Sequence, residues 1–152
     1  MPYWFDGNNL MGISAAIARR DRASRRAFLL TLYAWRKTGG GSFLVYFDGD
    51  DPADSTALPG VAVRYSAPES TDTLICRRLR EIERPGEVIV VTNDLELSSN
   101  CRNAGAVTFT WRQFSLKMHA RARRTPSASQ NADDNVDVDE WMRYFGLDKP
   151  ET

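Results

Sequence analysis

The sequence is poor in the residues that build disulfide frameworks and zinc sites, since its 152 residues include two cysteines and one histidine. Cys76 and Cys101 can form neither a disulfide framework nor a zinc ribbon, which favours a reducing, cytoplasmic location. Long apolar runs are also missing: the longest cover about five residues, so no membrane-spanning segment is expected. With 42% hydrophobic and 26% charged residues, the composition excludes a wholly disordered or collagenous chain.

The formal net charge is zero, yet the charges are distributed unevenly along the sequence. Residues 1–124 contain 18 Lys and Arg against 13 Asp and Glu, whereas residues 125–152 contain 2 against 7. The two parts therefore carry opposite net charges of equal size. A basic body of this kind suggests a polyanionic partner.

Short β-branched or aromatic runs alternate with helical patterns along the first 124 residues. Strands are expected at residues 3–5, 43–47, 61–65, 88–91 and 107–110. Helices are expected from Ser14 to the glycines at 39–41, from Thr71 to Pro85, after Asp94 as far as Gly105, and from the last strand to Arg124. This alternation predicts an α/β fold with a mostly parallel five-stranded sheet and helices on both faces.

The remaining residues differ in composition from this body. Residues 125–135 are predicted to form a polar linker. Residues 136–152 are predicted to be an acidic tail with a short amphipathic helix that contains Trp141 and Phe145. One hypothesis is that this tail folds back on the basic helices and competes with RNA; the alternative is a solubilising tail.

Three of the predicted strands end in an aspartate: Asp6, Asp48 and Asp94. Because the carboxyl ends of parallel strands meet at one edge of a sheet, these side chains should converge there, with Asp72 of the second helix as a fourth. Two carboxylates about 4 Å apart repel by roughly 4 kcal/mol at an effective dielectric of 20. A divalent cation would remove this repulsion, and oxygen ligands favour Mg²⁺ or Mn²⁺. Each aspartate could instead be a turn former or a helix cap.

The local sequences around these aspartates resemble the NYN domain family, in particular the YacP-like branch of the PIN-like ribonucleases. The resemblance lies in the order and spacing of five short motifs: Asp6-Gly7-Asn8-Asn9-Leu10, Phe47-Asp48, Glu69-Ser70-Thr71-Asp72, Thr92-Asn93-Asp94 and Ala104-Gly105-Ala106. The segment from Val138 to Gly146 also resembles the end of many YacP-like chains.

The resemblance implies a PIN-like three-layer fold and a metal-dependent ribonuclease site in residues 1–124. If the site residues of the family are carried over to this sequence, the catalytic and metal-binding residues would be Asp6, Asp48, Asp72 and Asp94. Asn9 would hold the first loop or touch the substrate, and Thr92 would shape the turn that carries Asp94. Three positions depart from the family pattern: Asn8 replaces an aromatic residue, Asn93 replaces Ser or Thr, and Thr73 stands where many relatives have a second acid.

Clusters of arginines on the first and second predicted helices could bind RNA phosphates. The candidates are Arg19, Arg22 and Arg26 on the first helix, and Arg77 and Arg80 on the second. The alternative is a solvated helix face with ion pairs between residues one turn apart. No nucleotide cofactor is expected, because the glycines at 39–41 follow a helix and precede a strand, the wrong order for a phosphate-cradling loop.

Two other functions remain open at this point. Phe47-Asp48-Gly49-Asp50 resembles the nucleophile motif of haloacid-dehalogenase-like phosphatases, although that family carries it on its first strand. A non-catalytic module that binds RNA or a ribonucleoprotein through the arginine helices is the second alternative. The leading hypothesis is a metal-dependent, endonucleolytic ribonuclease, with no prediction of its oligomeric state.

Overall fold

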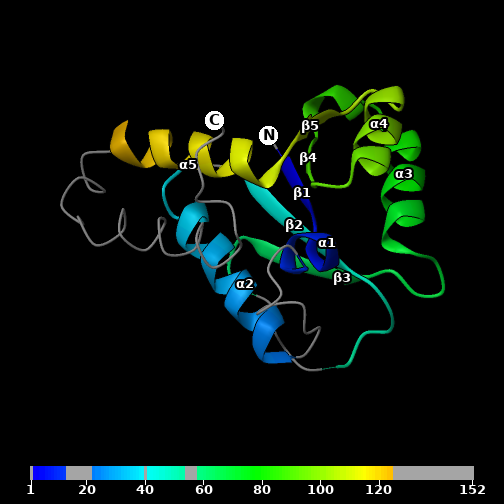
Figure 1. Cartoon of the computed structure of the whole chain (residues 1–152), viewed down its shortest axis with the longest axis horizontal. Coiled ribbons are helices and arrows are strands. Elements are labelled where there is room, and N and C mark those ends of the chain that lie inside the picture. The colour runs from blue at the N-terminus through cyan, green and yellow to red at the C-terminus, as the bar shows by residue number, and fades with distance from the viewer. Residues whose placement is uncertain (1, 13–21, 40, 54–57, 125–152) are drawn as a thin grey trace.

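We describe residues 2–12, 22–39, 41–53 and 58–124 of a computed structural model of the chain (Figure 1). They contain a five-stranded sheet with the order β3-β2-β1-β4-β5 in which every neighbouring pair is parallel. The strands are β1 (Pro2–Asp6), β2 (Ser42–Phe47), β3 (Val61–Tyr65), β4 (Ile89–Val91) and β5 (Val107–Phe109). All five carboxyl ends therefore lie along one edge, and the strand order reverses beside the central strand β1.

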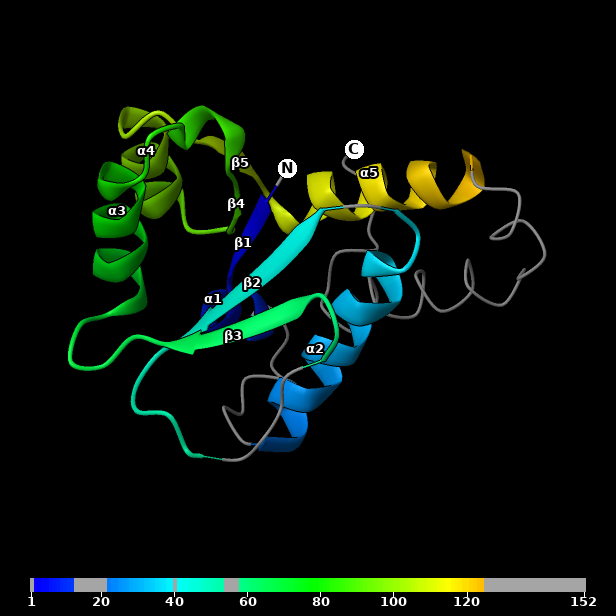
Figure 2. The same cartoon turned by 180° about the vertical axis from the view of Figure 1, so that it is seen from behind.

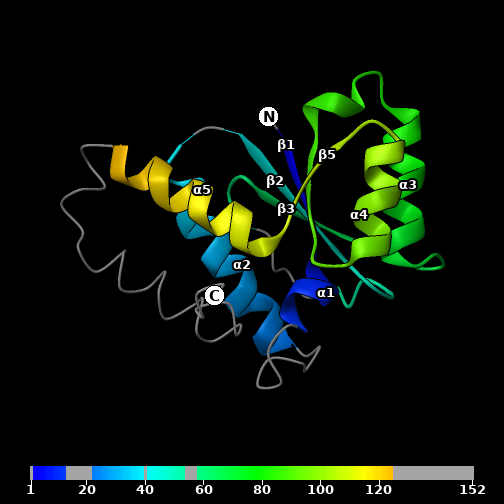
Figure 3. The same cartoon turned by 45° about the horizontal axis from the view of Figure 1, so that its top comes forward.

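Helices cover both faces of the sheet, as Figures 1 and 3 show, so the predicted α/β architecture is confirmed. One face carries α2 (Arg22–Arg36) and α5 (Trp111–Arg124), and the other carries α3 (Thr71–Glu81) and α4 (Leu95–Asn103). Side chains of a strand point alternately to the two faces. Tyr3 and Phe5 accordingly join the core under α2 and α5, whereas Trp4 joins the core under α3 and α4.

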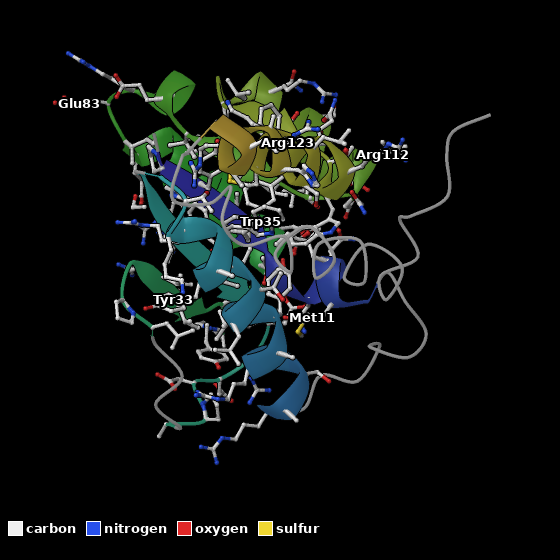
Figure 4. All side chains as sticks on the ribbon, turned by 90° about the vertical axis from the view of Figure 1, so that its left-hand side faces the viewer. Met11, Tyr33, Trp35, Glu83, Arg112 and Arg123 are labelled. Atoms are coloured by element: carbon white, nitrogen blue, oxygen red, sulfur yellow. The ribbon has the colours of Figure 1, made fainter. Side chains whose placement is uncertain are left out.

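The two cores have different compositions. Aromatic rings dominate the first, where Phe5, Phe43 and Phe114 pack with centroids 5.0–5.9 Å apart. Met11 and Trp35 are buried on this side, while Arg112 and Arg123 project from α5 (Figure 4). The second core contains more aliphatic side chains and both cysteines, which are buried free thiols.

The structure adds one helix that the sequence pattern does not predict, α1 (Gly7–Met11), directly after β1. The start of α1 packs closely against the end of β2. A Cβ atom on Gly7 would lie only 2.6 Å from the Phe47 ring, so glycine allows this close approach. The strands agree with the expected ones to within a residue or two, whereas α2 and α3 end at Arg36 and Glu81, a few residues before the expected stops at Gly39 and Pro85. A 3-10 turn (Pro85–Glu87) precedes β4. The expected helix start at Ser14, the linker and the acidic tail lie outside the described residues. None of the described helices is long and apolar enough to cross a membrane.

Candidate active site

The four aspartates singled out from the sequence gather at the carboxyl edge of the sheet. Asp6 is the last residue of β1, Asp48 follows β2, Asp94 precedes α4, and Asp72 lies in the first turn of α3. Each of the other three carboxylates lies near enough to raise the pKa of Asp6. The expected convergence of these side chains is therefore present in the fold.

Asp6 is the buried member of the group, with 3% of its surface exposed. The pKa of Asp6 is raised to about 7: burial raises it most, the hydrogen bond from Thr92 lowers it, and the charges of Asp72, Asp48 and Asp94 raise it. A carboxyl group that titrates near neutrality at the edge of a parallel sheet is typical of a functional site, because a purely structural role does not need this costly placement.

The Thr92 side chain connects two of the aspartates. Its hydroxyl donates to Asp6 Oδ2 at 2.9 Å, with Asn9 Oδ1 at 3.3 Å, and its Oγ1 accepts the Asp94 backbone N–H at 3.1 Å. Asn9 Oδ1 also accepts the Asn93 backbone N–H at 2.9 Å, which ties α1 to the loop after β4. Thr92 thus shapes the turn before Asp94, and Asn9 holds the first loop in place.

Two of the departures from the family pattern have clear contacts in this fold. Asn8 Oδ1 accepts the Asp48 backbone N–H at 2.6 Å, so a buried amide fixes the position of the loop after β2. Asn93 Oδ1 accepts the Trp111 backbone N–H at 2.9 Å, at the start of α5. Both asparagines therefore fasten strand-end loops to helices.

The third departure is Thr73, on the first turn of α3. Its hydroxyl oxygen accepts a hydrogen bond from the Ser70 hydroxyl at 3.0 Å, and its backbone N–H donates to Ser70 Oγ at 3.2 Å. Thr73 therefore takes part in the N-terminal cap of α3.

Asp48 and Asp94 are each held at a helix N-terminus. Asp48 Oδ1 accepts the Thr71 backbone N–H at 3.0 Å, and Asp94 Oδ1 accepts the N–H groups of Glu96 at 2.9 Å and Leu97 at 3.3 Å. These are the capping contacts considered as an alternative from the sequence. Each aspartate can cap a helix and still belong to the acidic edge. The cap uses only Oδ1, and no described residue binds Oδ2 of Asp48 or of Asp94.

Glu96 is a member of the acidic group that the sequence reasoning missed. Asp72 is exposed, and its pKa is raised by partial burial and by the charges of Asp94, Asp48 and Glu96. The missed signal is the capping role of Asp94, which places Glu96 in the same first turn of α4. A fifth carboxylate thus borders the site.

The donor chemistry of this site is that of a hard cation, since it consists of carboxylate oxygens. The described residues nevertheless contain no three Asp, Glu, His or Cys side chains that are positioned together around one point as an ion would require. One oxygen of Asp48 and one of Asp94 are directed to backbone N–H groups.

The candidate phosphate-binding arginines are dispersed over two helices. Arg77 is held by Glu69 at 2.7 Å and by Glu81 at 3.1 Å, the ion-paired arrangement expected of a solvated helix face. Arg22 and Arg26 lie exposed on the first turns of α2, and Arg80 lies exposed on α3. Arg19 lies outside the described residues.

The parallel five-stranded sheet with helices on both faces and an acidic carboxyl edge defines the class of the chain as an α/β protein. The family described as the YacP-like NYN domain matches residues 4–143, and the chain belongs to this family. This membership supports a nuclease, and in general a ribonuclease. No curated protein matches the sequence.

Solved structures of Rae1 (YacP) from Bacillus subtilis share the fold. A mutant form is similar with a TM-score of 0.66 at 15% identity, over 95% of this chain and 91% of that chain. Another structure of the same protein gives 0.65 at 15% identity, over 95% and 92%. The predicted fold class and family are thereby confirmed.

Proposed function

We propose that this protein is a metal-dependent ribonuclease that cleaves RNA internally by hydrolysis of a phosphodiester bond. The observation that carries the proposal is the buried Asp6 carboxyl, which is surrounded by the charges of Asp48, Asp72 and Asp94 at the edge of a parallel sheet. Membership of the YacP-like NYN family supports RNA as the substrate.

Mg²⁺ or Mn²⁺ suits the electrostatics of this site. Burial alone disfavours the ionised form of Asp6, and the neighbouring carboxylates add to that cost. The residues that would hold the ion are Asp6, Asp48, Asp72 and Asp94, with Glu96 beside them. When bound, a divalent ion supplies a positive charge that activates water and stabilises charge on a phosphodiester.

The chain's own residues keep these carboxylates in place. Thr92 binds Asp6 through its hydroxyl and supports the turn that carries Asp94. Asn8 and Asn9, both on α1, anchor the loops after β2 and β4. Because these contacts join three strand ends, the acidic edge is organised before any ligand arrives.

Cleavage of RNA by the purified full chain tests the proposal. A circular single-stranded RNA should be linearised in Mg²⁺ or Mn²⁺ and left intact in EDTA, since only an endonuclease opens a circle. Asp6→Asn and Asp94→Asn should abolish cleavage, while Glu83→Gln, at an exposed site after α3, should not. Wild-type cleavage that persists in EDTA, or in both aspartate variants, would contradict the mechanism.

The same assay separates the alternatives. Binding to RNA with steep salt dependence and without cleavage in either metal would favour the non-catalytic RNA-binding or ribonucleoprotein-binding module. Hydrolysis of a small phosphate ester without RNA cleavage would favour phosphatase chemistry at Asp48.

A further inference from the structure

A groove of about 650 Å³ lies beside the acidic site, between the edge strand β3 and helix α3. We call it the edge groove. Its lining comes from residues 49–51 after β2, residues 63–69 along and after β3, and four side chains of α3: Leu74, Arg77, Arg78 and Glu81. Figure 2 shows β3 at the margin of the sheet, with the loop after it leading to α3.

The edge groove adjoins the acidic site along the chain. Asp48 immediately precedes the first lining segment, and its carboxylate accepts the backbone N–H of Thr71 at the start of α3. Gly49 donates to Ser66 Oγ, which connects the loop after β2 to the loop after β3. The edge groove therefore begins next to Asp48, at the border of the acidic site.

A row of three side chains leads from Asp6 across the sheet to this groove. Tyr46 is the register partner of Asp6 on one side and of Arg64 on the other. Tyr46 packs against Trp4 at 5.7 Å in the core under α3 and α4, so the row lies on that face. Neighbouring strands are about 4.8 Å apart, which places Arg64 roughly 10 Å along the sheet from Asp6.

Two arginines in the groove have no ion-pair partner among the described residues. Arg64 is exposed on β3, and Arg78 lies over the Trp4 ring at 5.6 Å from its centroid. Both arginines line the groove, and their charges lower the pKa of the Tyr46 phenol against the larger, opposite effect of its burial. The Tyr46 hydroxyl is buried and has no hydrogen-bond partner in the described part of the chain.

Two of the four acids that line the groove are already paired. Glu69 and Glu81 are both engaged by Arg77. Asp50 and Asp51 lie exposed on the loop after β2. Arg64 and Arg78 are therefore the cations left to bind an anion from outside, and guanidinium groups match the geometry of a phosphate.

We propose that the edge groove binds the nucleotide next to the scissile phosphodiester of a single-stranded RNA, with Arg64 and Arg78 on its phosphate. The proposal rests on the proposed ribonuclease function and adds the location of the substrate strand. Leu74 supplies apolar lining for the base. A volume of about 650 Å³ lies within the usual range for ligand pockets of about 300–1,000 Å³.

Steady-state cleavage of a short single-stranded RNA by full-length Arg64→Gln and Arg78→Gln variants tests this location. Each variant should raise KM about five- to tenfold and leave kcat within about twofold, because the contact is made equally before and during reaction. The slope of log affinity against log salt should fall by about 0.7 for each arginine removed. Arg84→Gln is the matched control, since Arg84 is exposed beyond α3 and contacts Glu87.

Arg64→Gln is the more decisive variant, because Arg64 is exposed and its replacement should not affect folding. Replacement of Arg78 could also affect stability, because Arg78 packs on Trp4. Melting temperatures of all variants are measured alongside. An Arg64→Gln protein with wild-type KM and salt slope would overturn the groove assignment and leave the ribonuclease proposal intact. A wild-type protein that cleaves no RNA would overturn both.

Discussion

Replacing Asp6 by asparagine should stabilise the metal-free protein at neutral and alkaline pH. The reason is the cost of keeping Asp6 ionised while it is 3% exposed and surrounded by other carboxylates. The pKa of Asp6 is about 7 in the folded protein against 3.8 without the fold. This difference corresponds to about 4 kcal/mol of lost stability once the pH exceeds 7.

The pH dependence has a definite sign. Because folding raises this pKa, the folded state binds the proton more tightly than the unfolded state between pH 4 and pH 7. The contribution of Asp6 to stability is fully present below pH 4 and is lost as the pH rises through 7. Asparagine has no charge to lose and can still accept the Thr92 hydroxyl hydrogen bond. The free energy of unfolding of Asp6→Asn should therefore exceed that of the wild type by about 4 kcal/mol at pH 8 and by less than about 2 kcal/mol at pH 5.

Urea unfolding of the wild-type and Asp6→Asn proteins at pH 5, 6, 7 and 8 in EDTA measures this advantage. Asp50→Asn is the control, because Asp50 is exposed and its replacement should change stability little at any pH. Mn²⁺ should stabilise the wild type but not the Asp6→Asn protein, since a ligand that binds only the folded state adds to stability. A wild-type protein as stable as Asp6→Asn at pH 8 would refute the electrostatic reasoning.

Three further variants examine the contacts around the site. Asp94→Ala should cost about 1 kcal/mol in urea unfolding, because two backbone N–H groups of α4 lose their acceptor, whereas Asp94→Asn should keep the cap; equal losses would contradict the capping role. Thr92→Val should cost about 1–3 kcal/mol in the same assay and reduce cleavage, since the Asp94 N–H loses its acceptor; unchanged stability would argue against this link. Gly7→Ala should lower the melting temperature by several degrees, because the new methyl group would lie 2.6 Å from the Phe47 ring and 2.8 Å from the Tyr46 carbonyl oxygen; an unchanged melting temperature would show that α1 can shift freely.

Much of the acidic site could be predicted from local patterns. Aspartates that follow β-branched runs lie at strand ends, and parallel strands place those ends on one edge. This reasoning brings Asp6, Asp48 and Asp94 together before any coordinates are known. It does not predict α1, because Gly7, Asn8 and Asn9 have low helical propensity and read as a turn.

Contacts across the sheet could not be predicted in this way. Nothing in the local sequence indicates that Asn8 binds the Asp48 backbone, since this contact depends on how α1 docks. The ion pair between Arg77 and Glu69 could not be predicted either, because Glu69 precedes the helix α3 that carries Arg77.

The sequence by itself determined the order of the strands along the chain, the aspartates at their ends and the uneven distribution of charge. Tertiary structure decided which of these aspartates is buried, because only the central position of β1 removes Asp6 from water. It also decided the row from Asp6 through Tyr46 to Arg64. That row depends on the register of three strands, and register is set by packing between segments about forty and about twenty residues apart rather than by any local pattern.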